Sequence, residues 1–222
     1  MSPVLVLELP MKRLRFVLVA VVAAVTALLF STTPSLAASP PNSIGVVGGS
    51  ITRLAVDGYH TLGGTAIWPS YQIGGGTIFA WQRDPAYFSR FEQQLSLYPG
   101  TSAIWWQLAA HDYDLDGVTQ QQAYATAVAV LDGIRQRTRP GTVVHASVMA
   151  AYAPDTGCYL NGTVVDAPAQ LRTILDRLVS NGLVQRGPTM PILQRSDLQG
   201  NGCHQNETGQ RKHGQVLLNY FG

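Results

Sequence analysis

Three polar clusters in this sequence contain the residue types that acyl-transfer chemistry requires. Ser50 follows a short β-branched apolar run and the pair Gly48-Gly49. His111 follows the apolar run TSAIWWQL, and His204 lies in a polar loop near the C-terminus. A serine hydroxyl becomes a useful nucleophile only when an imidazole removes its proton, and the oxyanion formed next needs fixed hydrogen-bond donors. A serine and a histidine at one edge of a sheet would supply the first two of these groups.

Ser50 has a structural interpretation as well as a chemical one. A serine that follows a strand and two glycines can cap the first turn of a helix through its side-chain oxygen. The carboxyl end of a strand is also where parallel α/β sheets place their catalytic residues. The choice between these interpretations depends on what the rest of the chain brings to the same edge.

The elements expected around these clusters are strands that alternate with helices. Apolar runs predict strands within 43–47, at 101–108, at 142–149 and, as a last short strand, at 189–193. Helical spacing predicts helices at 51–59, 85–98, 118–137 and 167–180, and from 209 toward the C-terminus, with an acidic loop at 109–117. Alternation of this kind predicts an α/β fold with a parallel sheet covered on both faces.

The N-terminal segment predicts export. Basic residues at 12–15 precede an uninterrupted apolar run at 16–30, and Ser35-Leu36-Ala37 has the small-x-small pattern of a cleavage site. We therefore predict a signal peptide at 1–37 with cleavage after Ala37, and Met11 is an alternative start. An uncleaved membrane anchor is the competing interpretation, although the run is short for a membrane span.

The remaining chain is expected to be a linker at 38–42 and a single domain at 43–222. The net charge of the protein is only +2 and its basic residues are scattered, which argues against a nucleic-acid-binding surface. The sequence has two cysteines, so an exported protein should contain a disulfide between Cys158 and Cys203. Two free thiols are the weaker alternative. We expect a secreted monomer with no stable membrane span after cleavage.

The segment DYDLDG at 112–117 matches the first half of a calcium-binding EF-hand loop. The twelfth position of that loop is Ala123, where calcium needs a bidentate glutamate. A solvated acidic lead-in to the next helix explains the segment without a metal. We therefore predict no metal site, and a calcium-dependent interaction module remains a third hypothesis.

Taken in order, the polar clusters resemble the four sequence blocks of the SGNH (GDSL-type) hydrolases, in a secreted, esterase-like branch. GGSIT at 48–52 resembles the first block, which carries the nucleophile, and IGGGT at 73–77 resembles the second, whose glycine donates a backbone N–H to the oxyanion. LAAHD at 108–112 resembles the third block, and NGCHQN at 201–206, followed by Gly209, resembles the last. The resemblance covers nearly the whole chain after the predicted cleavage site.

The resemblance implies a three-layer α/β/α sandwich with a flavodoxin-like parallel sheet of about five strands. It also implies a serine hydrolase that cleaves an ester through an acyl-enzyme on Ser50, with His204 as the base and no cofactor. The oxyanion hole would consist of the Ser50 and Gly75 amides and the His111 side chain, with Gly74 as the alternative to Gly75.

Four positions differ from the family pattern. The aspartate before the nucleophile is Gly49, the third-block glycine is Ala109, the oxyanion-binding asparagine is His111, and the acidic residue three before the catalytic histidine is Asn201. A neutral imidazole at His111 can still donate one N–H. The altered positions nevertheless suggest a slow enzyme.

The group that would orient His204 has two candidates. Asn201 can orient an imidazole through its side-chain carbonyl but cannot stabilise imidazolium by charge. Asp197 lies in the same loop and could take that role instead. Loss of the orienting charge lowers turnover about 10⁴-fold in a serine protease.

The substrate class expected from the sequence is a small-molecule or polysaccharide ester, such as an acetylated carbohydrate, a lipid ester or a small ester. Trp68 and Tyr71 lie between the first two blocks and are candidates for a substrate cleft. The alternative function is that of a catalytically weak or inactive relative that binds carbohydrate or cell-wall material. The altered positions around the site motivate this alternative.

Overall fold

The computed structural model describes residues 39–222 except 157, 159–166 and 201. These described residues belong to one compact unit. The predicted signal peptide at 1–37 lies outside the described residues. Within the described ranges, no helix combines the length and the apolar character that a membrane span requires.

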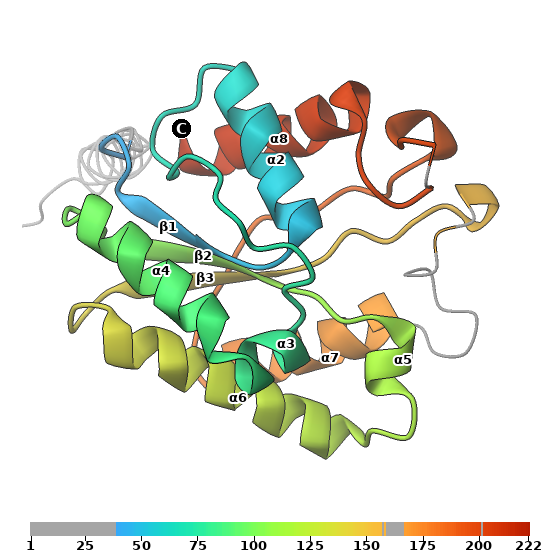
Figure 1. Ribbon diagram of the computed structural model, residues 1–222. Helices are drawn as coiled ribbons and strands as arrows, with labels where there is room; N and C mark the ends of the chain where they lie inside the picture. Colours follow the sequence, from blue (N-terminus) through green and yellow to red (C-terminus); the bar gives the residue numbers. More distant parts are fainter. Residues whose placement is uncertain (1–38, 157, 159–166, 201) are drawn as a thin grey trace, which may run out of the picture. The chain divides into compact units, whose positions relative to one another are not determined.

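Strands and helices alternate along the described chain (Figure 1). The strands are β1 (Ile44–Val47), β2 (Ala103–Leu108), β3 (Val143–Val148) and β4 (Gln185–Arg186). The helices are α2 (Ser50–Thr61), α3 (Ile78–Arg83), α4 (Pro85–Leu97), α5 (Asp112–Leu115), α6 (Gln120–Arg137), α7 (Ala167–Ser180) and α8 (Glu207–Phe221). Short 3₁₀ turns lie at Pro154–Thr156 and Arg195–Asp197.

All strand pairs of the sheet are parallel, and the described strands have the order β1-β2-β3-β4. Beyond β1, Ile67 forms a single parallel bridge with Ile44. If the Ile67 segment is included, the spatial order is that of a flavodoxin-like sheet, in which the second segment of the chain lies outside the first strand. This confirms the predicted fold class, with the outer strand beside β1 reduced to one bridge.

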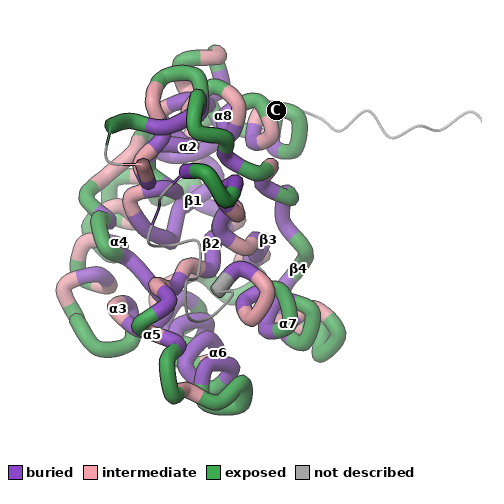
Figure 2. The backbone as a smooth tube through the Cα atoms, turned by 90° about the vertical axis from the view of Figure 1, so that its right-hand side faces the viewer, coloured by how far each residue is buried: buried purple, intermediate pink, exposed green. Residues whose placement is uncertain are grey.

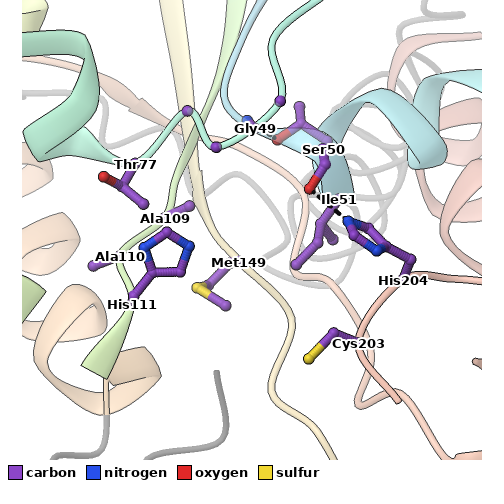
Figure 3. A pocket seen from close by; sticks show the side chains of 14 residues that line it. Gly49, Ser50, Ile51, Thr77, Ala109, Ala110, His111, Met149, Cys203 and His204 are labelled. Atoms are coloured by element: carbon purple, nitrogen blue, oxygen red, sulfur yellow. Dashed lines mark hydrogen bonds between the residues drawn. The ribbon is translucent and has the colours of Figure 1, made fainter. Parts of the chain in front are cut away.

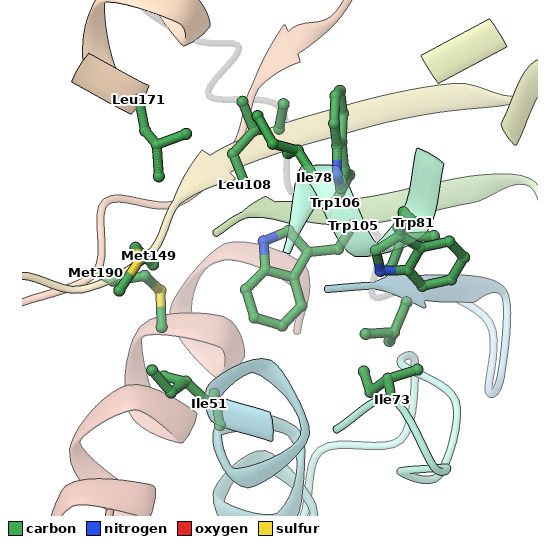
Figure 4. Close-up of a cluster of buried hydrophobic side chains, with 14 of the residues drawn as sticks. Ile51, Ile73, Ile78, Trp81, Trp105, Trp106, Leu108, Met149, Leu171 and Met190 are labelled. Carbon is green, nitrogen blue, oxygen red and sulfur yellow. The ribbon is translucent and has the colours of Figure 1, made fainter. Parts of the chain in front are cut away.

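Helices cover both faces of the sheet and make a three-layer α/β/α arrangement (Figure 1). Helices α2 and α8 lie on one face, and α4, α6 and α7 lie on the other. Buried residues follow the strands and the inner sides of the helices (Figure 2). Trp105 and Trp106 of β2 are both buried and point to opposite faces (Figure 4). Successive side chains of a strand alternate between faces, so β2 contributes an indole to each layer of the core.

Helices α2 and α8 pack closely because glycines lie at their contact. A Cβ atom on Gly58 would overlap the carbonyl oxygen of Gln210, and a Cβ on Gly214 would overlap the backbone around Gly58. The two backbones therefore approach closer than larger residues allow. Since α2 begins at Ser50 and α8 follows the His204 loop, this contact fixes the two polar clusters relative to each other.

The structure corrects three local predictions. The last strand is Gln185–Arg186 rather than 189–193, where Leu193 forms only an isolated bridge with Tyr152. The segment 109–117, expected to be a loop, contains the four-residue helix α5. Helix α3, with six residues, was not predicted either. Helices this short span fewer than two turns, so hydrophobic periodicity does not reveal them.

Candidate active site

A pocket of about 320 Å³ opens at the carboxyl ends of the central strands (Figure 3). The pocket is surrounded by four segments: the turn and first residues of α2 at 49–52, the glycine loop at 74–77, the loop after β2 at 109–111 and the His204 loop. Its lining consists of Gly49, Ser50, Ile51, Thr52, Gly74, Gly75, Gly76, Thr77, Ala109, Ala110, His111, Met149, Cys203 and His204. All four segments that resemble the SGNH blocks therefore contribute to one pocket.

Ser50 and His204 are in hydrogen-bonding contact inside this pocket. Nε2 of His204 lies 3.0 Å from Oγ of Ser50, although the two residues are 154 positions apart (Figure 3). This distance is within the range that a general base needs to take a proton from a nucleophile. Both side chains are partly exposed to the pocket, so a substrate atom can reach them.

The turn that presents Ser50 is held by buried polar bonds. The Gly49 amide donates to Oγ1 of Thr52 at 2.9 Å, and the Thr52 hydroxyl donates to Oε1 of Gln107 on β2 at 2.7 Å. A Cβ on Gly48 would overlap Thr52. The paired glycines thus allow a tight exit from β1, and the threonine fastens it to the neighbouring strand.

The glycine loop at 74–76 packs directly against this turn. A Cβ on Gly76 would overlap the carbonyl oxygen of Gly48, which also accepts a hydrogen bond from the Trp81 indole at 2.9 Å. The Tyr87 hydroxyl donates to the Gly74 carbonyl at 2.7 Å. Gly75 has a φ of +68°, a value that favours glycine. Aromatic side chains from α3 and α4 therefore hold the loop beside Ser50.

The segment around His204 is fixed on both sides. The predicted disulfide joins Cys158 to Cys203, and the Cys203 carbonyl accepts a hydrogen bond from the Tyr152 hydroxyl at 3.0 Å. On the other side, the side-chain amide of Gln205 donates to Nδ1 of His213 on α8 at 2.7 Å. These contacts anchor the backbone that carries the imidazole.

Of the two candidates for orienting His204, the structure describes one. Asn201 lies outside the described residues. The carboxylate of Asp197 accepts hydrogen bonds from Nζ of Lys212 at 2.7 Å and from the Gln194 amide at 2.9 Å. Burial alone would raise the pKa of Asp197, but these bonds outweigh it and hold the pKa below its usual value. The structure therefore corrects the Asp197 prediction, because this carboxylate is bound to α8 rather than to the imidazole.

The side of the pocket opposite Ser50 contains an arrangement that the sequence did not predict. Nδ1 of His111 lies 3.0 Å from Oδ2 of Asp114, and the His111 amide donates to the same oxygen at 3.1 Å. The Thr77 side chain also contributes to lowering the pKa of this carboxyl group. Asp114 precedes the end of the one-turn helix α5 and is three residues after His111. The only sequence signal for this pair was that spacing, which places two side chains on the same face of a helical turn.

Asp114 is ionised at neutral pH. Burial raises its pKa, but hydrogen bonds from His111 and Thr77 outweigh burial and hold the pKa below its ordinary value. In addition, the Arg83 guanidinium lies 3.7 Å from its second oxygen. Asp114 is therefore a fixed acceptor that links the glycine loop, the His111 loop and α3.

The structure also corrects the prediction of a cleft at Trp68 and Tyr71. Trp68 is fully buried, and its indole donates to Oγ1 of Thr101 at 3.0 Å. The Tyr71 hydroxyl donates to the Val46 carbonyl at 2.6 Å. Neither side chain lines the pocket. The reason is that the segment at Ile67 pairs with β1, which draws these aromatic side chains into the core beneath it.

Comparisons with known proteins find few matches. No family model matches the sequence, and no curated protein matches it. The structure is similar to the Clostridium thermocellum family 3 carbohydrate esterase, with a TM-score of 0.49 and 16% identity over 80% of this chain and 93% of that chain. A likeness this distant does not identify the reaction or substrate of this chain. In the described part of the chain, no group of three His, Cys, Asp or Glu side chains is placed to hold a metal ion.

Proposed function

We propose that the protein is a serine hydrolase that cleaves an ester through an acyl-enzyme on Ser50. The observation that carries the proposal is the 3.0 Å contact between Oγ of Ser50 and Nε2 of His204 in an open pocket. The placement of Ser50 at the carboxyl end of β1 supports the same conclusion, because α/β sheets bind their ligands at this edge.

In the proposed reaction, Nε2 of His204 takes the hydroxyl proton while Oγ of Ser50 attacks the ester carbonyl. The tetrahedral intermediate then collapses, and the alcohol leaves with the proton from His204. Water, activated by the same imidazole, attacks the acyl-enzyme and releases the carboxylic acid and free Ser50. The acylation step needs Ser50 as nucleophile, the deacylation step uses water instead, and His204 acts in both steps as base and then acid.

The oxyanion would form beside the start of α2. Ser50 is the first residue of that helix, and the first amides of a helix have no acceptor within it. The helix dipole also favours negative charge there. We propose that the Ser50 and Gly75 amides and the His111 side chain bind the oxyanion, since all three residues line the pocket.

Asn201 is the remaining candidate for orienting His204. An amide oxygen can fix the imidazole tautomer but provides no charge for the imidazolium. We therefore propose a lower turnover than that of a comparable enzyme with a carboxylate at this position.

The substrate we propose is an ester with a small acyl group. A pocket of about 320 Å³ is at the small end of ligand-binding sites. A carbohydrate acetyl ester or another small ester fits this description better than a lipid ester with a long acyl chain. We also propose that the protein is secreted, and the disulfide supports export because such bonds persist in oxidising compartments.

The test is hydrolysis of p-nitrophenyl acetate by the wild type and by Ser50→Ala, with Ser89→Ala on the exposed side of α4 as the control. We expect Ser50→Ala alone to lose turnover, while all three proteins keep the same melting temperature. A fluorophosphonate probe should label the wild type and the control but not Ser50→Ala, even if deacylation is slow.

Equal background rates and no labelling in all three proteins would contradict the proposal. In that case, the alternative of a catalytically inactive protein that binds carbohydrate or cell-wall material would lead, and sedimentation with insoluble polysaccharide would test it.

A further inference from the structure

Two histidines face the pocket from opposite sides, and their hydrogen-bonding partners differ. His204 contacts the hydroxyl of Ser50, whereas His111 contacts the ionised carboxylate of Asp114 (Figure 3). The His111 ring lies across the pocket from Ser50, with one nitrogen toward the pocket. Because Nδ1 is the nitrogen beside Asp114, the nitrogen toward the pocket is Nε2.

The carboxylate decides which nitrogen of His111 carries a proton. An ionised carboxylate can only accept hydrogen bonds, so Nδ1 must be the donor. A neutral imidazole has a single N–H, which leaves a lone pair on Nε2. A lone pair toward a developing oxyanion repels it. The neutral form of His111 therefore cannot serve as the oxyanion donor in this geometry.

We propose that His111 acts as an imidazolium cation, with Nδ1–H bound to Asp114 and Nε2–H donated to the oxyanion, and that Asp114 is the positioning residue that maintains this state. This inference rests on the proposed function. It replaces the neutral amide donor of the resembled family with a charged donor. Charge-assisted hydrogen bonds are shorter and stronger than neutral ones.

Several ionisable groups surround His111 and contribute to its charge state. On α5, Asp112 and Asp114 are the acidic residues, and the Tyr113 ring stacks on the imidazole with 4.6 Å between the ring centroids. From α3, Arg83 approaches Asp114 at 3.7 Å but is exposed. Across the pocket lies His204. The carboxylate in direct contact is the closest of these charges, and it favours the cation.

The charges balance during catalysis. Before reaction, the positive charge of His111 is matched by Asp114, and His204 is neutral. Transfer of the Ser50 proton creates an imidazolium at His204 and a negative oxyanion, so these two new charges also cancel. A cation at His111 would thus offset part of the loss in turnover proposed above for an uncharged orienting residue.

The proposal predicts a bell-shaped pH profile of kcat/KM for p-nitrophenyl acetate. The acidic limb reports protonation of His204, and the alkaline limb reports loss of the proton from His111. Glutamine places an amide N–H at about the reach of imidazole Nε2 and keeps it at every pH. His111→Gln should therefore lose the alkaline limb, with a plateau about tenfold below the wild-type maximum.

Asp114→Asn tests the positioning role. Removal of the carboxylate should move the alkaline limb to lower pH by about one unit, which is the usual effect of losing an opposite charge in contact. Asp116→Asn is the matched control, because Asp116 directly follows the same helix and is exposed. The control should keep the wild-type profile. A purely structural role of Asp114 would change the maximum rate and leave both limbs in place.

Nitrogen-15 NMR of the imidazole side chains in Ser50→Ala separates this inference from the proposed function. We expect His111 to hold a proton on Nδ1 at all pH values and to gain one on Nε2 as the pH falls. A neutral form protonated on Nε2 would overturn the inference even if the protein is an esterase. An alkaline limb retained in His111→Gln would also overturn it. Absence of any turnover above Ser50→Ala would instead remove the proposed function, and the NMR titration would still report the charge state of His111.

Discussion

The two sides of the pocket are held in place by different forces. Ser50 and His204 belong to the side where α2 packs against α8, with glycines at the contact and a disulfide next to the histidine. His111 lies on the other side, just before a helix of one turn, and its orientation depends on the ionised Asp114. Packing and a covalent bond fix the positions of Ser50 and His204, whereas a hydrogen bond to an ionised carboxylate fixes the orientation of His111.

This difference has a mechanistic consequence. Close packing is short-ranged and tolerates little change in volume, so the nucleophile and base keep one geometry. A hydrogen bond to an ionised carboxylate depends on charge, so the opposite side should respond to removal of that charge rather than to a change in volume. Perturbations of packing and perturbations of charge should therefore affect the two sides separately.

The largest expected effect comes from removal of the disulfide. Its cysteines are 45 positions apart, for which the chain-entropy model predicts a loss of about 4 kcal/mol in the free energy of unfolding. We expect the double variant Cys158→Ala/Cys203→Ala to show this loss in urea unfolding, together with a lower kcat, because Cys203 precedes the base. A loss below 1 kcal/mol would mean that the hydrogen bond from Tyr152 already fixes the loop.

The second largest effect we expect is a dependence of the protein's stability on pH that arises from His213 on α8. Burial lowers the pKa of this imidazole to about 4, against about 6.5 in an unfolded chain. The contribution of His213 to the free energy of unfolding is therefore fully present above pH 6.5. It is lost as the pH falls toward 4, and the total loss is about 3 kcal/mol. His213→Gln should flatten the unfolding free energy across this window. A wild-type curve that is flat between pH 6.5 and 4 would contradict the burial argument.

The contact between α2 and α8 can be tested through Gly58. Its Cβ would meet the backbone of Gln210, which cannot rotate away, so Gly58→Ala should destabilise the protein by about 2 kcal/mol and lower turnover. The control is Gly100→Ala, where no atom lies within 4 Å of the new Cβ. Chemical unfolding of both variants measures the difference. Equal stability of the two would show that the helices can move apart at little cost.

The smallest effect is expected at Asp197. Its partner Lys212 is partly exposed, so Asp197→Asn should cost about 1 kcal/mol or less. Because this carboxylate is bound to α8, kcat should stay within about twofold of the wild type. A fall in kcat of about 10⁴-fold would instead assign Asp197 as the charge that orients His204.

Most of the regular elements were predictable from the sequence. The strands at β1, β2 and β3 and the helices α4, α6 and α7 match the apolar patterns, because burial on one or both sides of a long element leaves a periodic signal. Short elements leave no such signal, which explains why α3 and α5 were missed. The last strand was misplaced because its two residues, Gln185 and Arg186, are exposed and polar.

The sequence predicted some residues of the candidate site correctly and missed others. The sequence identified Ser50, His111 and His204, and all three line one pocket. It assigned Trp68 to a cleft, because a segment with an aromatic residue near glycines can line a cleft or belong to the core, and its sequence does not distinguish the two. It also missed the role of Asp114, whose segment matched part of a calcium-binding loop.

The sequence by itself determined the order of the elements, the glycine turn before Ser50 and the pairing of the two cysteines. Only the tertiary structure decided that Ser50 meets His204 across 154 positions and that Asp114 meets His111 rather than solvent. Periodicity and turn residues are local properties that each segment carries in its own sequence. Contacts between polar groups depend on distances that exist only after the sheet and both helix layers have assembled.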